Sequence, residues 1–338
     1  MTGYSGPKLW QPTRVEVLFG RGCRPLPVLY WAGGERGDFQ TKRLPLSALR
    51  IAVRAYNARR FFGVLVMSTE DPRFAGVARL YGIEGLERLR AAHVAVVGIG
   101  GVGSWAAEAM ARCGVGEISL FDLDDVCVSN SNRQLHALSS TVGRAKVEVM
   151  ADRLREVNPD CVVHAVADFV TRETMAEYIT PDIDCVLDCI DSVNAKAALI
   201  AWCKRRKIQI ITTGGAGGQI DPTLIQVCDL NRTFNDPLAS KVRSTLRRDY
   251  GFSRTVTRHY SVPCVFSTEQ LRYPKPDGSI CLQKSFVGDG VKLDCAGGFG
   301  AVMMVTATFG MVAATKAVDK IVAGVRRPSE RAKAQPAA

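Results

Sequence analysis

The pattern that most constrains this 338-residue chain is an apolar run, residues 93–99, that leads into Gly98-Ile99-Gly100-Gly101-Val102-Gly103. Residues 104–113 then follow a helical pattern that stops at Gly114, a residue suited to a helix end. Glycines between a strand and a helix let the backbone turn tightly and approach a phosphate, and the free N–H groups of the helix favour negative charge. The pattern predicts a strand–turn–helix unit with an anion site at its turn.

Strand and helix patterns continue to alternate along the chain. Apolar runs predict strands at residues 117–123, 162–166, 184–190 and 208–213. Helical patterns occupy residues 83–91, 141–157, 172–178 and 195–206. Because alternating strands and helices form parallel sheets covered on both faces, the expected fold class is α/β, a doubly wound, mostly parallel, Rossmann-like sheet.

The part after residue 222 departs from this alternation. Residues 223–230 and 280–286 predict strands of a more antiparallel region, separated by a polar, basic segment at residues 241–260. Residues 299–322 predict a buried helix, because their apolar run is shorter than the ~20 residues of a membrane span. We therefore expect a nucleotide-binding part at residues 73–222 and a smaller C-terminal α+β extension at residues 223–325 that binds the substrate.

The formal net charge of +11 is concentrated at the two ends of the chain. Residues 1–66 carry eleven Lys/Arg and three Asp/Glu, a net charge of +8, and residues 326–338 carry +3. The body between them is neutral overall, so any basic surface on it is local. Residues 1–66 lack a sustained apolar period, and we interpret them as a non-native or disordered basic leader before Met67. We expect residues 326–338 to form a disordered tail.

The 11 cysteines include no C-x-x-C pair. Most of them, such as Cys185 and Cys189, lie in apolar runs, which predicts reduced, buried thiols in a cytoplasmic protein. Structural zinc ligands usually come in closely spaced pairs, so we expect no zinc site. Cys264 is either a thiol nucleophile or a buried strand cysteine, and we favour the buried cysteine.

Charged residues follow the glycine-rich turn in an informative order. Asp122 ends the second predicted strand, where a carboxylate can accept hydrogen bonds from ribose hydroxyls. The glycines and Asp122 alone fit a nicotinamide-dependent oxidoreductase equally well. Arg133 and Lys146 favour adenylation instead, because two cations can neutralise the charge of a triphosphate as pyrophosphate leaves.

Two further acids, Asp188 and Asp191, lie near the end of the strand predicted at residues 184–190. A carboxylate just beyond such a strand can hold Mg²⁺ against bound phosphates, and Asp191 is in that position. Asp188 lies within the strand, and we expect it to be a paired structural residue.

These motifs, in this order and spacing, resemble the ubiquitin-activating-enzyme-like family of adenylyltransferases. The resemblance implies binding of ATP by Gly98, Gly100, Gly101, Gly103, Asp122, Asn132 and Ser192, action of Arg133 and Lys146 on the triphosphate, and Mg²⁺ binding by Asp191. It also implies a homodimer in which each subunit supplies an arginine to the other, for which Arg79 is the candidate.

One branch of that family, the tRNA threonylcarbamoyladenosine dehydratases, is similar over about residues 73–324. The matching stretches are residues 132–138, residues 264–269, residues 298–300 and the unusual Thr212-Thr213-Gly214-Gly215-Ala216-Gly217-Gly218-Gln219-Ile220-Asp221-Pro222-Thr223. The implied substrate is tRNA carrying threonylcarbamoyladenosine, whose carboxylate is activated with ATP before ring closure.

The alternative within the family is activation of a sulfur-carrier protein, although that branch usually bears paired C-x-x-C ligands. A sulfur-transfer protein is a further candidate partner, and we expect no interaction with a membrane. A nucleotide-sensing or scaffold protein without turnover is the non-enzymatic alternative, against which Arg133, Lys146 and Asp191 argue.

A tRNA substrate needs a positively charged surface. Aromatic residues lie among the basic residues of one segment, which gives it stacking partners as well as charge. The candidates are Lys241, Arg243, Arg247, Arg248, Arg254 and Arg258. A second cluster, residues 204–207, is interpreted as a solvated helix end, where cations are favoured.

Overall fold

The structure is a computed structural model that describes residues 71–275, 277–282 and 299–324. The proposed basic leader, residues 1–66, and the tail, residues 326–338, lie outside the described residues.

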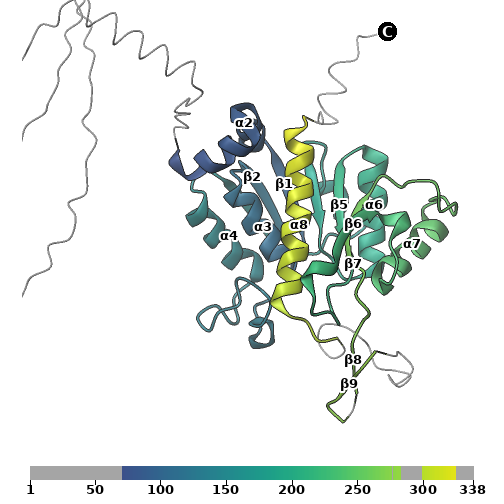
Figure 1. Cartoon of the computed structure of the whole chain (residues 1–338). Coiled ribbons are helices and arrows are strands. Elements are labelled where there is room, and N and C mark those ends of the chain that lie inside the picture. Colours follow the sequence, from purple (N-terminus) through teal and green to yellow (C-terminus); the bar gives the residue numbers. More distant parts are fainter. Residues whose placement is uncertain (1–70, 276, 283–298, 325–338) are drawn as a thin grey trace, which may run out of the picture. The chain divides into compact units, whose positions relative to one another are not determined.

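A seven-stranded sheet forms the centre of the described part (Figure 1). Its strand order is β3-β2-β1-β4-β5-β7-β6, and every neighbouring pair is parallel except β7 with β6. The strand bounds are His93–Val97 (β1), Glu117–Phe121 (β2), Val162–Val166 (β3), Cys185–Asp188 (β4), Gln209–Thr213 (β5), Ile225–Asp229 (β6) and Pro263–Ser267 (β7). From β1 the following strands, β2 and β3, lie on one side, and from β4 the later strands lie on the other side. The carboxyl ends of β1 and β4 therefore border the crevice where such sheets bind ligands.

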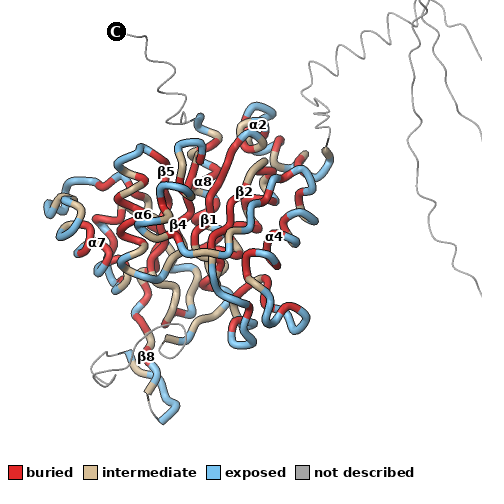
Figure 2. Tube along the Cα trace, turned by 180° about the vertical axis from the view of Figure 1, so that it is seen from behind, coloured by how far each residue is buried: buried red, intermediate tan, exposed pale blue. Residues whose placement is uncertain are grey.

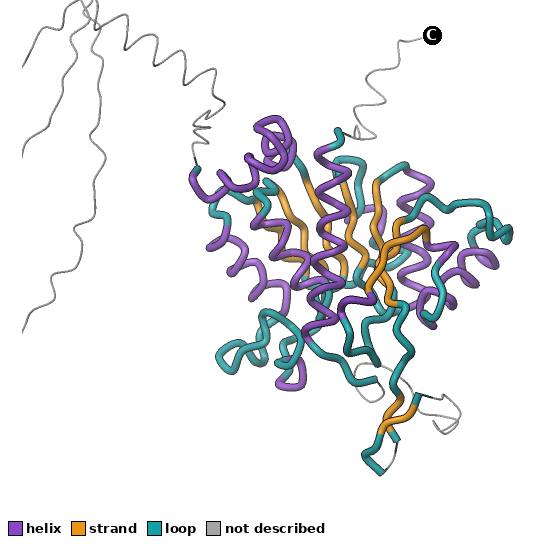
Figure 3. Tube along the Cα trace, viewed as in Figure 1, coloured by secondary structure: helices purple, strands orange, loops and turns teal. Residues whose placement is uncertain are grey.

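Helices cover both faces of this sheet (Figure 3). One face carries α2 (Ala75–Arg90), α3 (Gly103–Arg112), α4 (Lys146–Val157) and α8 (Met303–Val322). The other carries α5 (Met175–Tyr178), α6 (Val193–Arg206) and α7 (Pro237–Asp249). Short 3₁₀ turns lie at Pro72–Phe74, Val128–Asn130, Pro222–Leu224 and Leu230–Arg232. The doubly wound α/β prediction is confirmed.

Strand β1 is buried on both sides, as Figure 2 shows for the centre of the molecule. Val94 and Val96 pack into the cluster formed with α3, α4 and α8. Ala95 and Val97 point the other way, into the cluster that includes α6 and α7. Continuous apolar sequence is the expected pattern for a strand buried on both faces.

Two predicted helices have different beginnings in the structure. The helix predicted at residues 83–91 starts earlier, at Ala75, and continues across a kink where Gly82 has a φ of 78°. The helix predicted at residues 141–157 starts only at Lys146. Thr141 explains the delay, because its hydroxyl accepts a hydrogen bond from the Leu138 N–H and so stabilises a turn before the helix.

The region after residue 222 contains more regular structure than the sequence predicted. Residues 237–249 form helix α7, and β7 joins β6 to the main sheet. A separate two-stranded sheet pairs β8 (Tyr273–Pro274) with β9 (Ile280–Cys281). The strand predicted at residues 280–286 is thus observed for two residues, and residues 283–286 lie outside the described part.

Helix α8 is the buried final helix that the sequence predicted. Val305, Phe309, Ala313 and Ala317 are each completely buried against the sheet. A methyl group at Gly310 would lie 2.5 Å from the Val102 carbonyl oxygen, so this glycine permits close packing against the start of α3. Among the residues that the structure describes, no helix is both long enough and apolar enough to cross a membrane.

Candidate functional site

The glycine-rich turn joins the carboxyl end of β1 to the start of α3. Gly98 has a φ of 89°, a conformation that side chains with a Cβ rarely adopt. A methyl group at Gly103 would lie 1.8 Å from the Gly98 carbonyl oxygen. The turn also contacts the end of β4, because a methyl group on Gly98 would lie 2.9 Å from the Cys189 carbonyl oxygen. Glycines are therefore required here to bring two strand ends and a helix start together.

Asp122 connects the end of β2 to this turn through hydrogen bonds. Its carboxylate accepts hydrogen bonds from the Ile99 N–H at 2.7 Å and from the Asp124 N–H at 3.0 Å. Burial raises the pKa of Asp122, while the charge of Lys146 and the two N–H donors oppose that rise. The residue lies where the sequence placed a ribose acceptor, and it also holds the turn in shape.

Lys146 is the first residue of α4 and is buried, with 6% of its surface exposed. Its Nζ lies 2.7 Å from Asp124 Oδ2 and 4.0 Å from Asp122 Oδ1. A cation that serves a nucleotide crevice would be expected to face solvent, but Lys146 is buried instead. A buried ammonium requires compensation, which the two carboxylates provide.

Arg133 and Asn132 lie in the loop that covers the start of α3. Arg133 Nη1 donates to the Ser129 carbonyl at 2.9 Å and to Asn132 Oδ1 at 3.1 Å. Asn132 Nδ2 donates to the Ala301 carbonyl at 2.7 Å, which ties the loop to the segment before α8. No carboxylate lies within 4.0 Å of the Arg133 guanidinium in the described part of the chain. This half-exposed cation is therefore available to an anion near Gly101, whose added methyl group would meet the Arg133 side chain at 3.2 Å.

Asp191 and Ser192 follow β4 in an exposed loop, and Ser192 precedes the first residue of α6. Asp191 thus lies beyond the carboxyl end of the strand beside β1, as predicted. No cluster of three His, Cys, Asp or Glu side chains suited to a metal ion occurs among residues 71–275, 277–282 and 299–324.

Asp188 is a structural residue, as expected. It is completely buried, its Oδ1 lies 2.9 Å from Lys196 Nζ, and the Thr212 hydroxyl donates to its Oδ2 at 2.6 Å. Lys196 also donates to the Asp188 backbone carbonyl at 3.1 Å. Lys196 was not predicted from the sequence. A lysine on the apolar face of a helix, with Leu199, Ile200 and Cys203 at helical spacing, indicates a buried partner.

Two other buried polar residues near the turn, His136 and Gln134, were not predicted as site residues from the sequence. His136 is 1% exposed, and neither ring nitrogen has a hydrogen-bond partner within the described structure. Burial, followed by the charge of Lys146, lowers the pKa of His136 to about 4. The side-chain oxygen of buried Gln134 also lacks a partner among the described residues. His136 is therefore a neutral imidazole near neutral pH.

Cys264 is completely buried in β7, and burial raises the pKa of its thiol well above the usual value. A thiol with a raised pKa is a poor nucleophile. The structure therefore agrees with the interpretation of Cys264 as a buried strand cysteine.

Arg79 is not brought to the glycine-rich turn within one chain. It is exposed on α2, the helix that leads into the amino end of β1, whereas the turn follows the carboxyl end (Figure 1). Arg88 of the same helix donates to the Val322 carbonyl at 2.5 Å, which places α2 against the last turn of α8. Only another subunit could bring Arg79 to this site.

The candidate tRNA-binding residues separate into two groups. Arg247 is half-buried, and its guanidinium donates to Tyr260 Oη at 3.0 Å and to Asn231 Oδ1 at 2.7 Å. Arg243 is also half-buried and donates to the Thr233 hydroxyl. The exposed members are Lys241, Arg248, Arg254 and Arg258.

The neighbouring aromatic rings are mostly engaged within the protein. Tyr260 is 5% exposed and packs edge-on against Phe252, with 4.9 Å between ring centroids. Arg172 and Arg205 lie over Tyr250. These rings therefore support α7 and its connection to α6 instead of forming an open stacking surface. The cluster at residues 204–207 lies at the end of α6, as predicted.

Comparisons with known proteins agree with the geometry. The sequence pattern of the ThiF family matches residues 74–335. The tRNA threonylcarbamoyladenosine dehydratase of Escherichia coli K12 is 54% identical over 264 residues, covering 78% of this chain and 98% of that protein. Its Haemophilus influenzae counterpart is 49% identical over 262 residues, covering 77% of this chain and 98% of that protein.

A crystal structure of the E. coli dehydratase in complex with ATP is also similar. It aligns with a TM-score of 0.66 and 50% identity over 80% of this chain and all of that chain. Because the family pattern spans most of the sequence, the chain belongs to the ThiF family.

Proposed function

We propose that this chain is an ATP-dependent tRNA threonylcarbamoyladenosine dehydratase. The observation that carries the proposal is the site itself, where Gly98–Gly103, Asp122 and Lys146 meet at the carboxyl ends of β1 and β2. The chain that bears this site is 54% identical to a protein of that activity. The same chain is similar to a dehydratase that was solved with ATP bound.

The reaction proceeds in two steps. A carboxylate oxygen of the threonyl group attacks the α-phosphorus of ATP, pyrophosphate leaves, and an acyl-adenylate forms. A nitrogen of the ureido group then attacks the acyl carbon, loses its proton, and expels AMP as the ring closes. Because nucleophile and acyl group belong to one nucleoside, the second step benefits from a very high effective concentration. It requires no covalent enzyme intermediate, which is consistent with the inert Cys264.

Each residue of the site has a role in the first step. Asp122 accepts hydrogen bonds from the ribose, and the turn with Gly100 and Gly101 presents backbone N–H groups to phosphate. Arg133 and Lys146 stabilise the negative charge that develops as pyrophosphate leaves. Asn132 orients Arg133, to which its Oδ1 is hydrogen bonded.

We propose that Asp191 holds Mg²⁺, with Ser192 beside it. A single exposed carboxylate fits this ion, because Mg²⁺ is commonly bound by one or two carboxylates together with substrate phosphates and water. When bound, the ion would neutralise charge on the triphosphate. The protein's own contribution is to hold the carboxylate close to the glycine-rich turn.

We also propose a cytoplasmic homodimer. Arg79 can act on a nucleotide only in a partner subunit, because α2 lies at the opposite edge of the sheet in its own chain. Leu80, next to it, is 81% exposed, and such an apolar residue beside Arg79 is suited to a subunit contact. A sulfur-transfer partner stays a prediction from sequence.

Modified tRNA should drive AMP formation by the purified protein, and unmodified tRNA should not. Only the modified nucleoside offers both a carboxylate to adenylate and a tethered nitrogen to close the ring. The measurement is AMP release with modified tRNA, unmodified tRNA and a sulfur-carrier protein ending in Gly-Gly, assayed in parallel. Turnover with the carrier protein alone would assign the chain to the sulfur-carrier activity instead, and hydride transfer to a nicotinamide would assign it to the oxidoreductases.

Neutralising the exposed basic residues should weaken tRNA binding without affecting ATP binding. Each phosphate contact that is lost should reduce the slope of log affinity against log salt by about 1, for modified and unmodified tRNA alike. The measurement is tRNA affinity at several salt concentrations for a variant in which glutamine replaces Lys241, Arg248, Arg254 and Arg258.

The control removes equal charge from other exposed or half-exposed positions, namely Arg73, Arg112, Arg155 and Lys316. If both variants lose the same affinity and the same salt dependence, binding reflects net charge and not a surface on α7 and the loop after it.

A further inference from the structure

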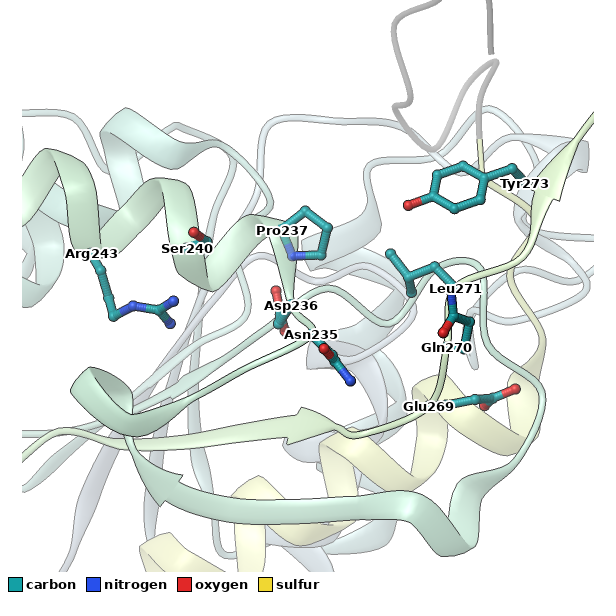
Figure 4. A pocket seen from close by; sticks show the side chains of 9 residues that line it. All are labelled: Asn235, Asp236, Pro237, Ser240, Arg243, Glu269, Gln270, Leu271 and Tyr273. Carbon is teal, nitrogen blue, oxygen red and sulfur yellow. The ribbon is translucent and has the colours of Figure 1, made fainter. Parts of the chain in front are cut away.

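A pocket of about 360 Å³ lies beside α7 (Figure 4). One wall is the start of the helix, with Asp236, Ser240 and Arg243, and the other is the segment after β7, with Leu271 and Tyr273. In Figure 4 the Arg243 guanidinium points toward Asp236, and the Tyr273 hydroxyl points toward Pro237. This volume lies within the range of small-molecule pockets, about 300–1,000 Å³.

The pocket lies at the same edge of the sheet as the nucleotide crevice. Asp236 Oδ2 accepts a hydrogen bond from the Gly215 N–H at 3.0 Å, just beyond the carboxyl end of β5. A methyl group on Gly214 would lie 1.7 Å from the same oxygen. Strand β5 pairs with β4, which leads to Asp191, and neighbouring strands are about 4.8 Å apart. A substrate could therefore occupy the pocket and reach the crevice.

The lining residues include one cation, Arg243, and two carboxylates, Asp236 and Glu269. Both carboxylates are already satisfied by backbone N–H groups: Asp236 by Ala239 and Gly215, and Glu269 by Ile220 and Asp221. Arg243, by contrast, has a hydroxyl partner in Thr233 and no carboxylate within 4.0 Å among the described residues. Burial, followed by the charge of Arg247, lowers the pKa of Arg243, and the charge of Asp236 opposes this change. A half-buried cation facing a pocket is suited to a carboxylate or phosphate ligand.

The remaining lining groups fit a planar ring with a polar substituent. Leu271 and Tyr273 are each 8% exposed and form an apolar wall opposite Pro237. The Tyr273 hydroxyl has no hydrogen-bond partner in the described part of the chain and is available to a ligand. Apolar surface with a few placed polar groups is typical of sites that bind nucleobases and similar rings.

We propose that this pocket receives the modified nucleoside and that Arg243 recognises the carboxylate of its threonylcarbamoyl arm on binding, before adenylation. This inference rests on the proposed function. It assigns the discrimination between modified and unmodified tRNA to the pocket, whereas the exposed basic residues bind the phosphate backbone of either. Arg243, which the sequence grouped with the backbone-binding residues, becomes a specificity residue.

Arg243→Gln tests the assignment through binding alone. The probes are two anticodon stem-loop RNAs that differ only in the threonylcarbamoyl group, with affinity measured by fluorescence anisotropy. Loss of a charge-assisted hydrogen bond should weaken binding of the modified RNA by about 10- to 100-fold and leave the unmodified RNA unchanged. Equal losses for both RNAs would mean that Arg243 contacts a phosphate, and unchanged affinity for both would mean that it contacts neither; either result overturns the proposal.

Filling the pocket provides a second test that leaves Arg243 in place. Ser240 is exposed on α7, so Ser240→Phe projects a ring over the pocket without disturbing the core. We expect a rise of at least about 10-fold in KM for modified tRNA, with ATP affinity unchanged. Ser244→Phe is the matched control, because Ser244 is exposed one turn later and does not line the pocket. Equal KM values for the two variants would contradict the proposal.

The inference and the proposed function can fail separately. AMP formation by the wild-type protein tests the function, whereas the affinity ratio of the two stem-loops requires no turnover. A wild-type protein that releases AMP, together with an Arg243→Gln variant that still prefers the modified RNA, would overturn the pocket assignment alone.

Discussion

Lys146→Ala should lower the rate of acyl-adenylate formation by about 10²–10³-fold, equivalent to about 2.7–4 kcal/mol of lost transition-state stabilisation. The ammonium is held next to the turn by Asp124 and Asp122, at 2.7 and 4.0 Å, so its charge is already in place when pyrophosphate leaves. Single-turnover release of pyrophosphate with modified tRNA measures the rate, and calorimetry measures ATP affinity separately.

The same substitution should change the environment of Asp122. Burial raises the pKa of this carboxyl group, and the charge of Lys146 opposes the rise. Without the lysine the pKa should rise further, so that Asp122 loses its charge at a higher pH. ATP affinity of the variant should therefore decline at a higher pH than that of the wild type as the solution is acidified.

Arg144→Ala is the control for Lys146. Arg144 lies two residues earlier and is exposed, and its ion pair with Asp152 at 2.8 Å joins two solvated side chains. Such pairs contribute about 0–1 kcal/mol, so this variant should adenylate at close to the wild-type rate. A Lys146→Ala variant as active as Arg144→Ala would show that Lys146 does not act on the triphosphate.

Asp188→Ala should reduce the free energy of unfolding by about 3–5 kcal/mol, because it leaves the Lys196 ammonium buried without a counter-charge. Lys196 is 1% exposed, and its Nζ lies 2.9 Å from Asp188 Oδ1. For a domain of this size each kcal/mol changes Tm by about 2–4 °C, so the expected decrease is about 6–20 °C. Thermal and denaturant unfolding measure the effect.

Replacing both partners with leucine should restore much of the loss, because an apolar pair removes the unpaired charge. Asp319→Ala provides the surface control: its ion pair with Lys316 at 2.9 Å is exposed and should change stability by less than about 1 kcal/mol. If the Asp188→Ala variant had the same Tm as the wild type, other groups would have to compensate the charge of the Lys196 ammonium. The pair also affects the site, because Lys196 Nζ donates a hydrogen bond to the Asp188 backbone carbonyl. This carbonyl lies at the end of β4, immediately before the loop that contains Asp191.

Helix α7 illustrates why part of the fold could not be predicted. Its apolar face consists mainly of Ala239, Val242 and Leu246, and the rest of the helix is polar and basic. Such a short stripe within a charged segment gives little periodic pattern. The helix forms because Asp236 caps its first turn and because the stripe packs against the cluster that includes α6. Neither contact is visible from residues 241–260 alone.

The bounds of strand β7 were not predicted for a related reason, although Cys264 was interpreted as a strand cysteine. Its five residues begin with Pro263 and include polar Ser267, and they follow a loop without a helical pattern. The strand is stabilised by pairing with β5 on one side and β6 on the other. Strand pairs between residues so distant in sequence depend on the tertiary fold, as β propensity generally does.

The sequence by itself determined the doubly wound fold, the turn at residues 98–103 and the identity of the residues around it. Those features are local: an apolar strand, glycines that alone permit the turn, and a helix with a clear end produce their pattern within a few residues. Strand β3 even has the predicted bounds, Val162–Val166.

Only the tertiary structure decided which charged side chains are buried and which partners they have. It placed Lys146 between two carboxylates and paired Asp188 with Lys196. It also gave Arg247 hydrogen-bond partners within the protein and placed Arg243 in the lining of a pocket. The physical reason is that a charge is stabilised or penalised by groups within a few ångströms of it, and these come from segments that lie far apart in the sequence.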